Sequence, residues 1–392
     1  MYSSALKTHL VDAVRDQANK RVEFRLDKVD AVYSSNIRLA GVGINDGKGL
    51  YNAVVGSYGI IKNIQILDGN KVLDEIRNFS DYLAFANTNK SNDVNAFKSH
   101  QLARNDLGFT YGYDTSGNNY MMGLQDRVGI NGDPGGLFSL RSYMNLLKST
   151  NVLPTQLFKN LRIVIDYAPI ANVSSDYNAT AKTLEPLMII DELMDEEQAK
   201  QAVAAMSVVS WDAIEHDRVS VGDITANEKK TFVINGFDGG KYVKRMLVQR
   251  KPVTDVNTTI RKSASSAFKN LKEQFVVNGS NKLPRRGLED DNERLALLVD
   301  TFGEMNVIPG GNVTDAPNHA NTHVTTTSSL ISSQCWTGLV IGDRVNEIQY
   351  MMERDLHTGA GNKANEPHDI NFFGEVGKTM VVKGGDYEIV YA

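Results

Sequence analysis

The stretch Asn371–Ala392, NFFGEVGKTMVVKGGDYEIVYA, fits two different folds, and the choice between them decides the class of the protein. Its segment Gly374–Thr379 resembles the second half of a phosphate-binding loop, Gly-x-x-x-x-Gly-Lys-Thr. In such a loop, backbone N–H groups wrap the phosphates and a helix begins directly afterwards. Here Phe372 occupies the position of the first glycine, and its side chain would crowd the wrap.

The residues that follow favour the other fold. Thr379–Lys383 is a β-branched and apolar run, Gly384–Gly385 supplies a turn, and Tyr387–Tyr391 is a second run rich in apolar residues. This order is typical of a β-hairpin. We therefore predict strand, turn and strand, without a nucleotide site and with Lys378 in contact with solvent or at an interface.

The composition is that of an ordinary globular protein with room for two or three domains. The chain has 392 residues, of which 41% are hydrophobic and 23% charged, and its formal net charge is −5. A negative chain lacks the basic footprint that holds proteins on nucleic acid. We expect no specific nucleic-acid recognition.

Cysteine content and the first residues bear on where the protein is made. Cys335 is the single cysteine, so the chain cannot form a disulfide within itself. Residues 1–21 lack the apolar run of a signal peptide. No stretch approaches the roughly 18 apolar residues that would span a bilayer. We expect a protein that is made and assembled inside a cell.

Most of the chain consists of short strands separated by polar loops, a pattern typical of sandwiches and barrels. The strands predicted from alternating or apolar runs are Val22–Leu26, Ile37–Leu39, Ile60–Leu67, Leu161–Tyr167, Leu187–Ile190, Arg218–Val221, Thr231–Ile234, Tyr242–Val248 and Gly338–Ile341. The sequence Asp68-Gly69-Asn70 after one of them signals a tight hairpin turn.

Two segments have helical spacing instead. Leu6, Leu10, Val11 and Val14 predict an amphipathic helix within residues 1–20, an N-terminal helical arm. A second helical pattern between Asp191 and Met206 predicts a linker helix between two all-β domains.

A repeated phrase suggests that these two domains are related. Tyr143–Pro154 reads YMNLLKSTNVLP, and Leu295–Pro309 reads LALLVDTFGEMNVIP. Each is a short helical run that leads to Asn-Val-aliphatic-Pro, and proline forces the preceding residue into an extended conformation. We predict that Pro154 and Pro309 occupy equivalent helix-to-strand corners of a duplicated β-domain.

Candidates for chemistry are weak. His319 and His323 could share a metal only on a helix, and their segment has the composition of loop and strand. A glycosidase needs two carboxylates that face each other across a cleft at roughly 5–9 Å. The acidic run Asp191–Glu197 is better explained by the favourable dipole at a helix start.

Two further polar groups are interpreted as structural. His216 and Asp217 near Trp211 suggest a polar corner at the entry to a domain. Lys282–Arg286 is a small basic surface loop without interleaved aromatic residues for base stacking. We assign no catalytic, cofactor-binding or metal-binding residue, and we predict that the protein is not an enzyme.

Several phrases resemble one known family. Tyr33–Phe85, which includes YSSNIRLAGVGIN and GIIKNIQILDGNKVLDEI, resembles the first barrel of double jelly-roll major capsid proteins of polinton-like viruses and virophages. Leu137–Tyr167 and Leu184–Leu193 are similar to the second part of that barrel and its exit. Asn365–Val382 resembles the closing segment of the family.

The resemblance implies an all-β fold of two consecutive eight-stranded jelly-roll barrels with short helices. The expected division is a helical arm at 1–20, a first jelly roll at 21–193, a linker helix at 194–207 and a second jelly roll at 208–392. The family carries no active site, so the resemblance transfers none.

The resemblance also implies partners and a location. Three copies would form a capsomer of pseudo-sixfold outline in the icosahedral shell of a double-stranded DNA virus. Expected contacts are other capsomers, penton and minor capsid proteins, and an internal membrane or the packaged genome beneath the shell. The location is the virion, after assembly inside the host cell.

Two other functions remain open from the residues alone. Jelly rolls also make glycan-binding and host-attachment proteins. Sugar-cleaving enzymes share all-β folds as well, so a glycoside hydrolase is the third hypothesis. Oligomeric state separates them, because a capsid protein forms trimers or larger shells.

Overall fold

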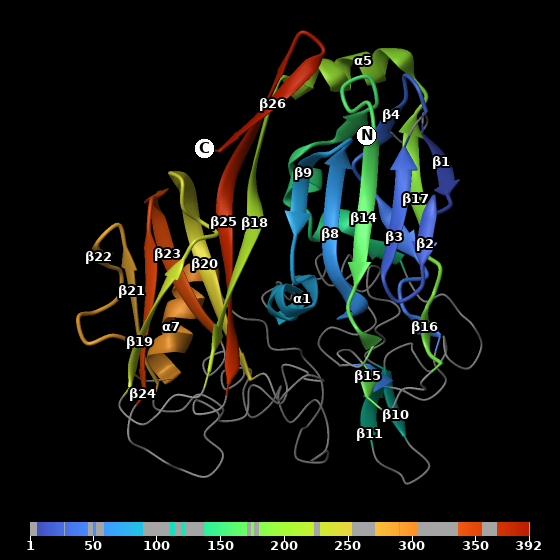
Figure 1. The fold of residues 1–392 in the computed structure, drawn as a ribbon. Helices are drawn as coiled ribbons and strands as arrows, with labels where there is room; N and C mark the ends of the chain where they lie inside the picture. Colours follow the sequence, from blue (N-terminus) through green and yellow to red (C-terminus); the bar gives the residue numbers. More distant parts are fainter. Residues whose placement is uncertain are drawn as a thin grey trace.

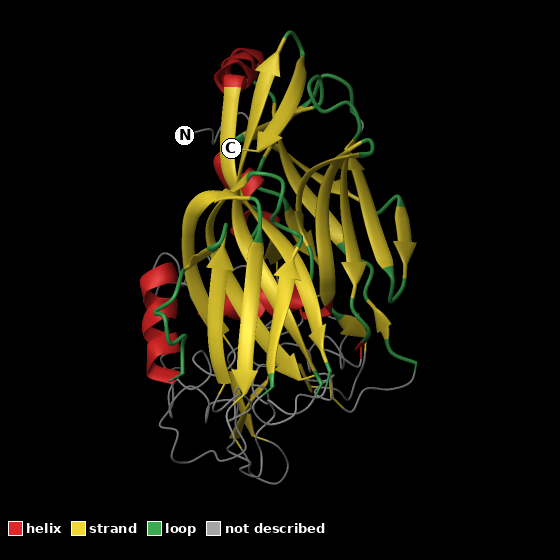
Figure 2. Ribbon diagram, turned by 60° about the vertical axis from the view of Figure 1, so that its left-hand side comes forward, coloured by secondary structure: helices red, strands yellow, loops and turns green. Residues whose placement is uncertain are grey.

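The computed structural model describes most of the chain outside several long connections. The described residues are 6–26, 28–45, 50–51, 59–88, 110–113, 119–122, 137–170, 174–175, 180–222, 228–252, 271–289, 291–303, 336–354 and 367–391. Strands make up most of this part, in two groups that stand side by side (Figures 1 and 2). The all-β double-barrel architecture predicted from the sequence is confirmed.

The first barrel consists of two sheets that enclose one apolar core. One sheet contains, in spatial order, β12 (Leu137–Ser139), β5 (Arg38–Ala40), β17 (Leu187–Leu193), β4 (Val32–Ser34) and β13 (Val152–Pro154), with β1 (Leu6–Val11) beside β17. The other contains β2 (Arg15–Gln17), β3 (Arg21–Leu26), β14 (Leu161–Tyr167), β8 (Ile61–Asp68) and β9 (Lys71–Ile76).

The second barrel repeats this plan. One sheet contains β18 (Val208–Val221), β25 (His368–Lys383), β20 (Lys241–Pro252) and β23 (Trp336–Val345), with β26 (Asp386–Tyr391) beside β25. The other contains β19 (Lys229–Ile234), β24 (Ile348–Arg354), β21 (Leu271–Val277) and β22 (Ser280–Asn281). All these pairs are antiparallel.

Short elements complete the described chain. The two-stranded sheets are β10 (Thr110–Tyr113) with β11 (Asn119–Met122), β15 (Ser174–Ser175) with β7 (Leu50–Tyr51), and β16 (Lys182–Thr183) with β6 (Ile44–Asn45). The helices are α1 (Phe79–Thr88), α4 (Asn145–Ser149), α5 (Glu196–Ala204) and α7 (Asp291–Phe302), and the 3-10 turns are Leu140–Ser142 and Ala205–Ser207.

The prediction of an N-terminal helix is wrong. Residues 6–11 form β1, which pairs with β17 in a register that places Leu6 opposite Leu193 and Val11 opposite Met188. A 3.6-residue period and a strand both place Leu6 and Leu10 on one face, so the spacing did not discriminate between them. The free edge of β17 offers backbone hydrogen bonds that a short isolated helix lacks, and this pairing decides the structure.

Each strand predicted from the sequence overlaps an observed strand, and a helix, α5, occurs in the segment where the linker helix was predicted. Asp195 caps α5, because its carboxylate accepts hydrogen bonds from the backbone N–H groups of Glu197 and Gln198 at 3.0 Å each. Pro154 ends β13 just after α4, as the predicted corner requires. Pro309 lies outside the described residues, so the proposed equivalence with Pro154 remains a prediction.

The closing stretch of the sequence, part of which resembles a phosphate-binding loop, forms a β-hairpin. Residues Gly374–Thr379 lie within β25, which pairs with β18 along its whole length. Gly384 and Gly385 form the turn with φ values of +60° and +83°, a region that glycine adopts without steric cost, and β26 returns along β25. The backbone N–H groups of this segment therefore serve sheet pairing.

The strand also explains why glycine occurs at Gly374. A Cβ atom built there would collide with the ring of Phe237, which is fully buried in the second core. Phe372, on the same face of β25, is fully buried as well. The feature that resembled a nucleotide motif is thus a packing requirement of the second barrel.

We predict that Gly374→Ala destabilises the protein by about 1–3 kcal/mol, because the added methyl group overpacks a filled core. Equilibrium urea denaturation measures this loss. Gly222→Ala is the matched control, since nothing lies within 4 Å of its Cβ position, and its effect should stay within about 0.5 kcal/mol. Equal stabilities for the two variants would contradict the packing account.

Candidate functional site: the junction between the barrels

Within the described residues, no group of three or more metal-binding side chains gathers in space. His319 and His323 lie outside the described part of the chain. In the basic loop Lys282–Arg286, the guanidinium of Arg286 pairs with Glu293 and the amine of Lys282 contacts the carbonyl oxygen of Ile341 at 3.4 Å. No helix in the described ranges is long and apolar enough to cross a membrane.

The acidic run divides between two elements, so its interpretation as one helix start is only partly right. Asp195–Glu197 begin α5, but Asp191 and Glu192 belong to β17. Asp191 pairs with Arg38 at 3.0 Å, and Glu192 pairs with Lys28 at 2.5 Å.

The carboxylate of Glu192 also contacts the ring of His9, on β1, at 2.6 Å. Burial alone would raise the pKa of Glu192, but the hydrogen bonds from Lys28 and His9 outweigh it and hold the pKa below its usual range. These acids therefore attach neighbouring segments to the first barrel, and they do not face each other across a cleft.

His216 does not lie at a corner, as the sequence suggested. It lies inside the long strand β18, with its ring 4.8 Å from that of Phe373 and Nε2 3.1 Å from the Oδ1 of Asn371. Burial lowers the pKa of His216, so its imidazole is neutral near pH 7. Asp217 beside it accepts hydrogen bonds from the backbone of Asn235 and Gly236.

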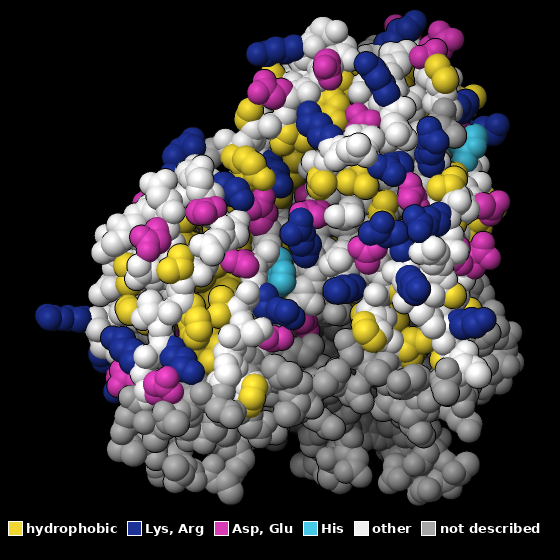
Figure 3. Space-filling model, viewed as in Figure 1, with side chains coloured by type: hydrophobic (Ala, Val, Ile, Leu, Met, Phe, Trp, Pro, Cys, Tyr) yellow, Lys and Arg dark blue, Asp and Glu magenta, His cyan; other side chains and the backbone are white. Residues whose placement is uncertain are grey.

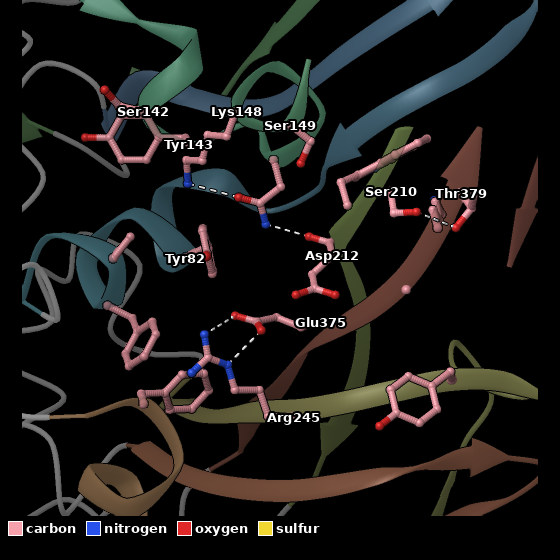
Figure 4. A pocket seen from close by; sticks show the side chains of 18 residues that line it. Tyr82, Ser142, Tyr143, Lys148, Ser149, Ser210, Asp212, Arg245, Glu375 and Thr379 are labelled. Carbon is pink, nitrogen blue, oxygen red and sulfur yellow. Dashed lines mark hydrogen bonds and ion pairs between the residues drawn. The ribbon is translucent and has the colours of Figure 1, made fainter. Parts of the chain in front are cut away.

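A cleft of about 660 Å³ lies between the two barrels (Figure 4). Its first wall comes from α1 and α4, and its second from β18, β20, β25 and the end of α7. Asn145 of α4 donates a hydrogen bond from Nδ2 to the carbonyl oxygen of Asp212 on β18, at 2.5 Å. The cleft is therefore bounded by a direct bond between the barrels.

Most charged groups of this cleft are neutralised by the protein itself. Arg245 makes two hydrogen bonds to the carboxylate of Glu375, at 2.7 and 2.8 Å (Figure 4). Lys244 pairs with Asp212 at 2.8 Å. Bidentate guanidinium–carboxylate pairs have fixed geometry. Ion pairs of this kind fix the positions of the strands that line the cleft.

Lys378 is not at the surface. Lys378 is only 8% exposed. Its amine lies 3.1 Å from the carboxylate of Glu215, and that carboxylate also pairs with Lys241 at 2.9 Å. Burial opposes the charge of Lys378, but Glu215 and the nearby Tyr391 outweigh this effect and raise the pKa of Lys378. The alternation of β25 directs this side chain into the junction between the barrels, so of the two predicted positions, solvent or an interface, the exposure to solvent is wrong.

Apolar contacts continue from one barrel into the other. The ring of Phe85 on α1 lies 4.7 Å from that of Phe302 on α7 and 5.5 Å from that of Trp336 on β23. Tyr82 lies 5.6 Å from Phe373 in the same way. One buried cluster includes side chains of both barrels, so the junction is part of the hydrophobic core.

A charged network lies inside the second barrel. Glu273 on β21 accepts hydrogen bonds from Arg294 at 2.8 Å and from the hydroxyl of Tyr350 at 2.6 Å, and it pairs with Arg250. All four side chains are at most 1% exposed. Burial opposes the charge of Glu273, but the two arginines outweigh it and keep the pKa of Glu273 below its usual range. Because Arg294 belongs to α7, the network fastens this helix to the sheet.

The visible outer face carries interspersed acidic and basic side chains and an indentation between the barrels (Figure 3). Large apolar side chains are also exposed. On or near β1 and β2 these are Leu6, Leu10 and Val14, and beside the junction they include Met194, Val208, Val390 and Tyr391. Exposed apolar residues on strands at sheet margins are common where proteins pair with one another.

No known protein-family profile matches the sequence, and no curated protein matches it significantly. Solved structures do match. The capsid protein VP54 of the virus PBCV-1, fitted into a reconstruction of the virophage Sputnik, is similar with a TM-score of 0.59 and 11% identity, over 99% of this chain and 97% of that one.

The virophages give similar results. The Sputnik virophage structure has a TM-score of 0.53 and 10% identity over 100% of this chain and 89% of that one. The mavirus major capsid protein has a TM-score of 0.51 and 9% identity over 99% and 90%. This chain has the double jelly-roll fold of these capsid proteins. The matches extend over 99–100% of this chain.

We predict that Glu273→Gln destabilises the second barrel by about 3–5 kcal/mol, because two buried guanidinium groups lose their counter-charge. Urea denaturation measures the loss. Glu289→Gln is the control, since Glu289 pairs with Lys272 at 3.3 Å on the surface, where such pairs contribute at most about 1 kcal/mol. A Glu273→Gln protein as stable as the control would show that the network does not anchor α7.

Proposed function

We propose that the protein is a major capsid protein that self-assembles as trimers of pseudo-hexameric outline into the icosahedral shell of a double-stranded DNA virus. The observation that supports this most is the extent of the structural likeness. Both barrels and their junction correspond to major capsid proteins over 99–100% of this chain in three comparisons. Fold alone does not establish function, so the proposal depends on how the molecule associates.

The geometry of the junction suits this role. Two barrels of similar size stand side by side and share a buried core, so one chain presents two equivalent units at a fixed spacing. Three such chains around a threefold axis form a ring of six barrels. Rings of this nearly hexagonal outline can pack side by side to cover a curved surface. Paired charges and aromatic contacts hold the two units together, as a shell requires.

We further propose the functional division of the chain. Residues 21–193 form the first jelly roll, 194–207 the linker and 208–392 the second jelly roll. Residues 6–20 are a β-arm, since β1 and β2 add to sheets of the first barrel. The free edge and exposed apolar side chains of this arm make it a candidate contact between copies.

The partners of the shell are part of the same proposal. Capsomers contact one another and meet penton and minor capsid proteins, with an internal membrane or the packaged genome beneath. The location is the virion. On the face that Figure 3 shows, charges of both signs are interspersed, and the formal net charge of the chain is −5, which agrees with contacts to proteins.

We predict a stable homotrimer. Size-exclusion chromatography with light scattering should give a mass near three times 43.2 kDa, or larger shells, because obligate interfaces commonly bury more than about 2,000 Å². Electron microscopy of the same material should show hexagonal capsomers or closed particles. A protein that stays monomeric at high concentration would overturn the proposal, and a monomer that binds glycans would support the attachment alternative.

A further inference from the structure

Asp74 is a buried acid at the junction without an ionic partner. It lies on β9 of the first barrel and is 1% exposed. Its Oδ2 accepts a hydrogen bond from the backbone N–H of Leu146, in α4, at 3.0 Å, and its Oδ1 accepts one from the backbone N–H of Glu75 at 3.1 Å. Both donors are neutral, and Asp74 forms no ion pair with any described residue.

The charged groups that face Asp74 are engaged elsewhere. Lys378, from β25, lies near it but pairs with Glu215 of β18. Lys148, from α4, also lies near it, and its amine donates a hydrogen bond to the Oδ1 of Asn145 at 2.9 Å.

The remaining neighbours leave the carboxylate without a counter-charge. β18 presents the neutral indole of Trp211, which is 4% exposed. From β26, the ring of Tyr391 lies over Lys378 at 5.1 Å. On its own strand, the side chain of Glu75 binds Gln65 and Arg77.

This environment differs from that of Glu273, a buried acid of the second barrel. Two guanidinium groups compensate the charge of Glu273, whereas Asp74 has backbone N–H groups, the indole of Trp211 and a lysine that is shared with Glu215. Burial therefore dominates, and it raises the pKa of Asp74 from 3.8 to about 6, although the hydrogen bond from Leu146 and the charge of Lys378 act against it.

We propose that Asp74 is a proton-operated latch between the two barrels. A proton on its carboxyl removes an uncompensated charge from the contact of β9 and α4 with β18 and β25. The junction is then tighter in mild acid and looser at neutral pH. The protonation state of Asp74 thereby makes the contact between the two barrels depend on the pH.

The direction of the pH effect follows from proton binding. The folded protein holds the proton of Asp74 more strongly than the unfolded chain does, so this group's contribution to stability falls as the pH rises. The fall extends from about pH 4, the ordinary range of the group, to about pH 6, where the folded carboxyl titrates. From about one pH unit above that value the loss is nearly complete and constant.

Asp74→Asn tests the latch, because an amide has the shape of the carboxyl and no charge at any pH. Stability of the wild-type protein and the variant is measured by urea denaturation from pH 4 to pH 8. The amide has one acceptor oxygen fewer than the carboxylate, and this loss is the same at every pH. We therefore expect the stability of the variant relative to wild type to rise from pH 4 to pH 8 by up to about 100-fold in the folding equilibrium, the equivalent of two pKa units. Taking the difference between the two proteins cancels all other titrating groups.

A local measurement accompanies this comparison and does not depend on the variant. Hydrogen exchange with mass spectrometry, corrected for intrinsic rates, follows the peptides of α4 and β26 in the wild-type protein at pH 5 and pH 7.5. Protection should be greater at pH 5, and Asp74→Asn should show that greater protection at both. Asp238→Asn, an exposed acid, is the control and should behave as wild type.

Two results would overturn the proposal. One is a wild-type junction whose corrected protection is the same at pH 5 and pH 7.5. The other is an Asp74→Asn protein whose stability relative to wild type does not rise between pH 4 and pH 8, since that outcome means that the charge of Asp74 does not weaken the junction.

Discussion

Strand β25 belongs to two barrels, and the rest of the structure depends on this sharing. On one face, Phe372 and Val376 fill the core of the second barrel, while Met380 further along joins the core of the first. Its pairing changes at the same point, from β20 to β26. Because side chains alternate on a strand, one continuous face can serve two cores in succession. This makes the distance between the barrels a property of a single hydrogen-bonded element.

The hairpin of β25 and β26 carries the second barrel onto the first. The hydroxyl of Tyr387 donates a hydrogen bond to Asp68 at the tip of β8, at 2.9 Å, and its ring lies 5.2 Å from that of Phe158. Lys71 contacts the carbonyl oxygen of Tyr387 at 3.1 Å. Strand β26 therefore has two roles: it extends the sheet of the second barrel, and it packs against the first barrel.

The sequence was sufficient for the class of fold and for most strands, because alternation and Gly-Gly or Asp-Gly turns are local signals. It also excluded a phosphate loop correctly, since Phe372 and the β-branched run are local too. It failed at β1, where Leu6 and Leu10 suit a helix or a strand and pairing with β17 decides. It also missed the burial of Lys378 and the isolation of Asp74, because both depend on which strands meet across the barrels. No motif signals such positions, and only the fold brings their neighbours together.

Native-state hydrogen exchange across a urea series tests the central claim most directly. If β25 joins the barrels into one cooperative unit, peptides of β14 in the first barrel and of β20 in the second lose protection over the same range of urea. We expect this single transition in the full chain. Loss of protection in β20 at a urea concentration that leaves β14 fully protected would show that the barrels unfold independently, and would contradict the account.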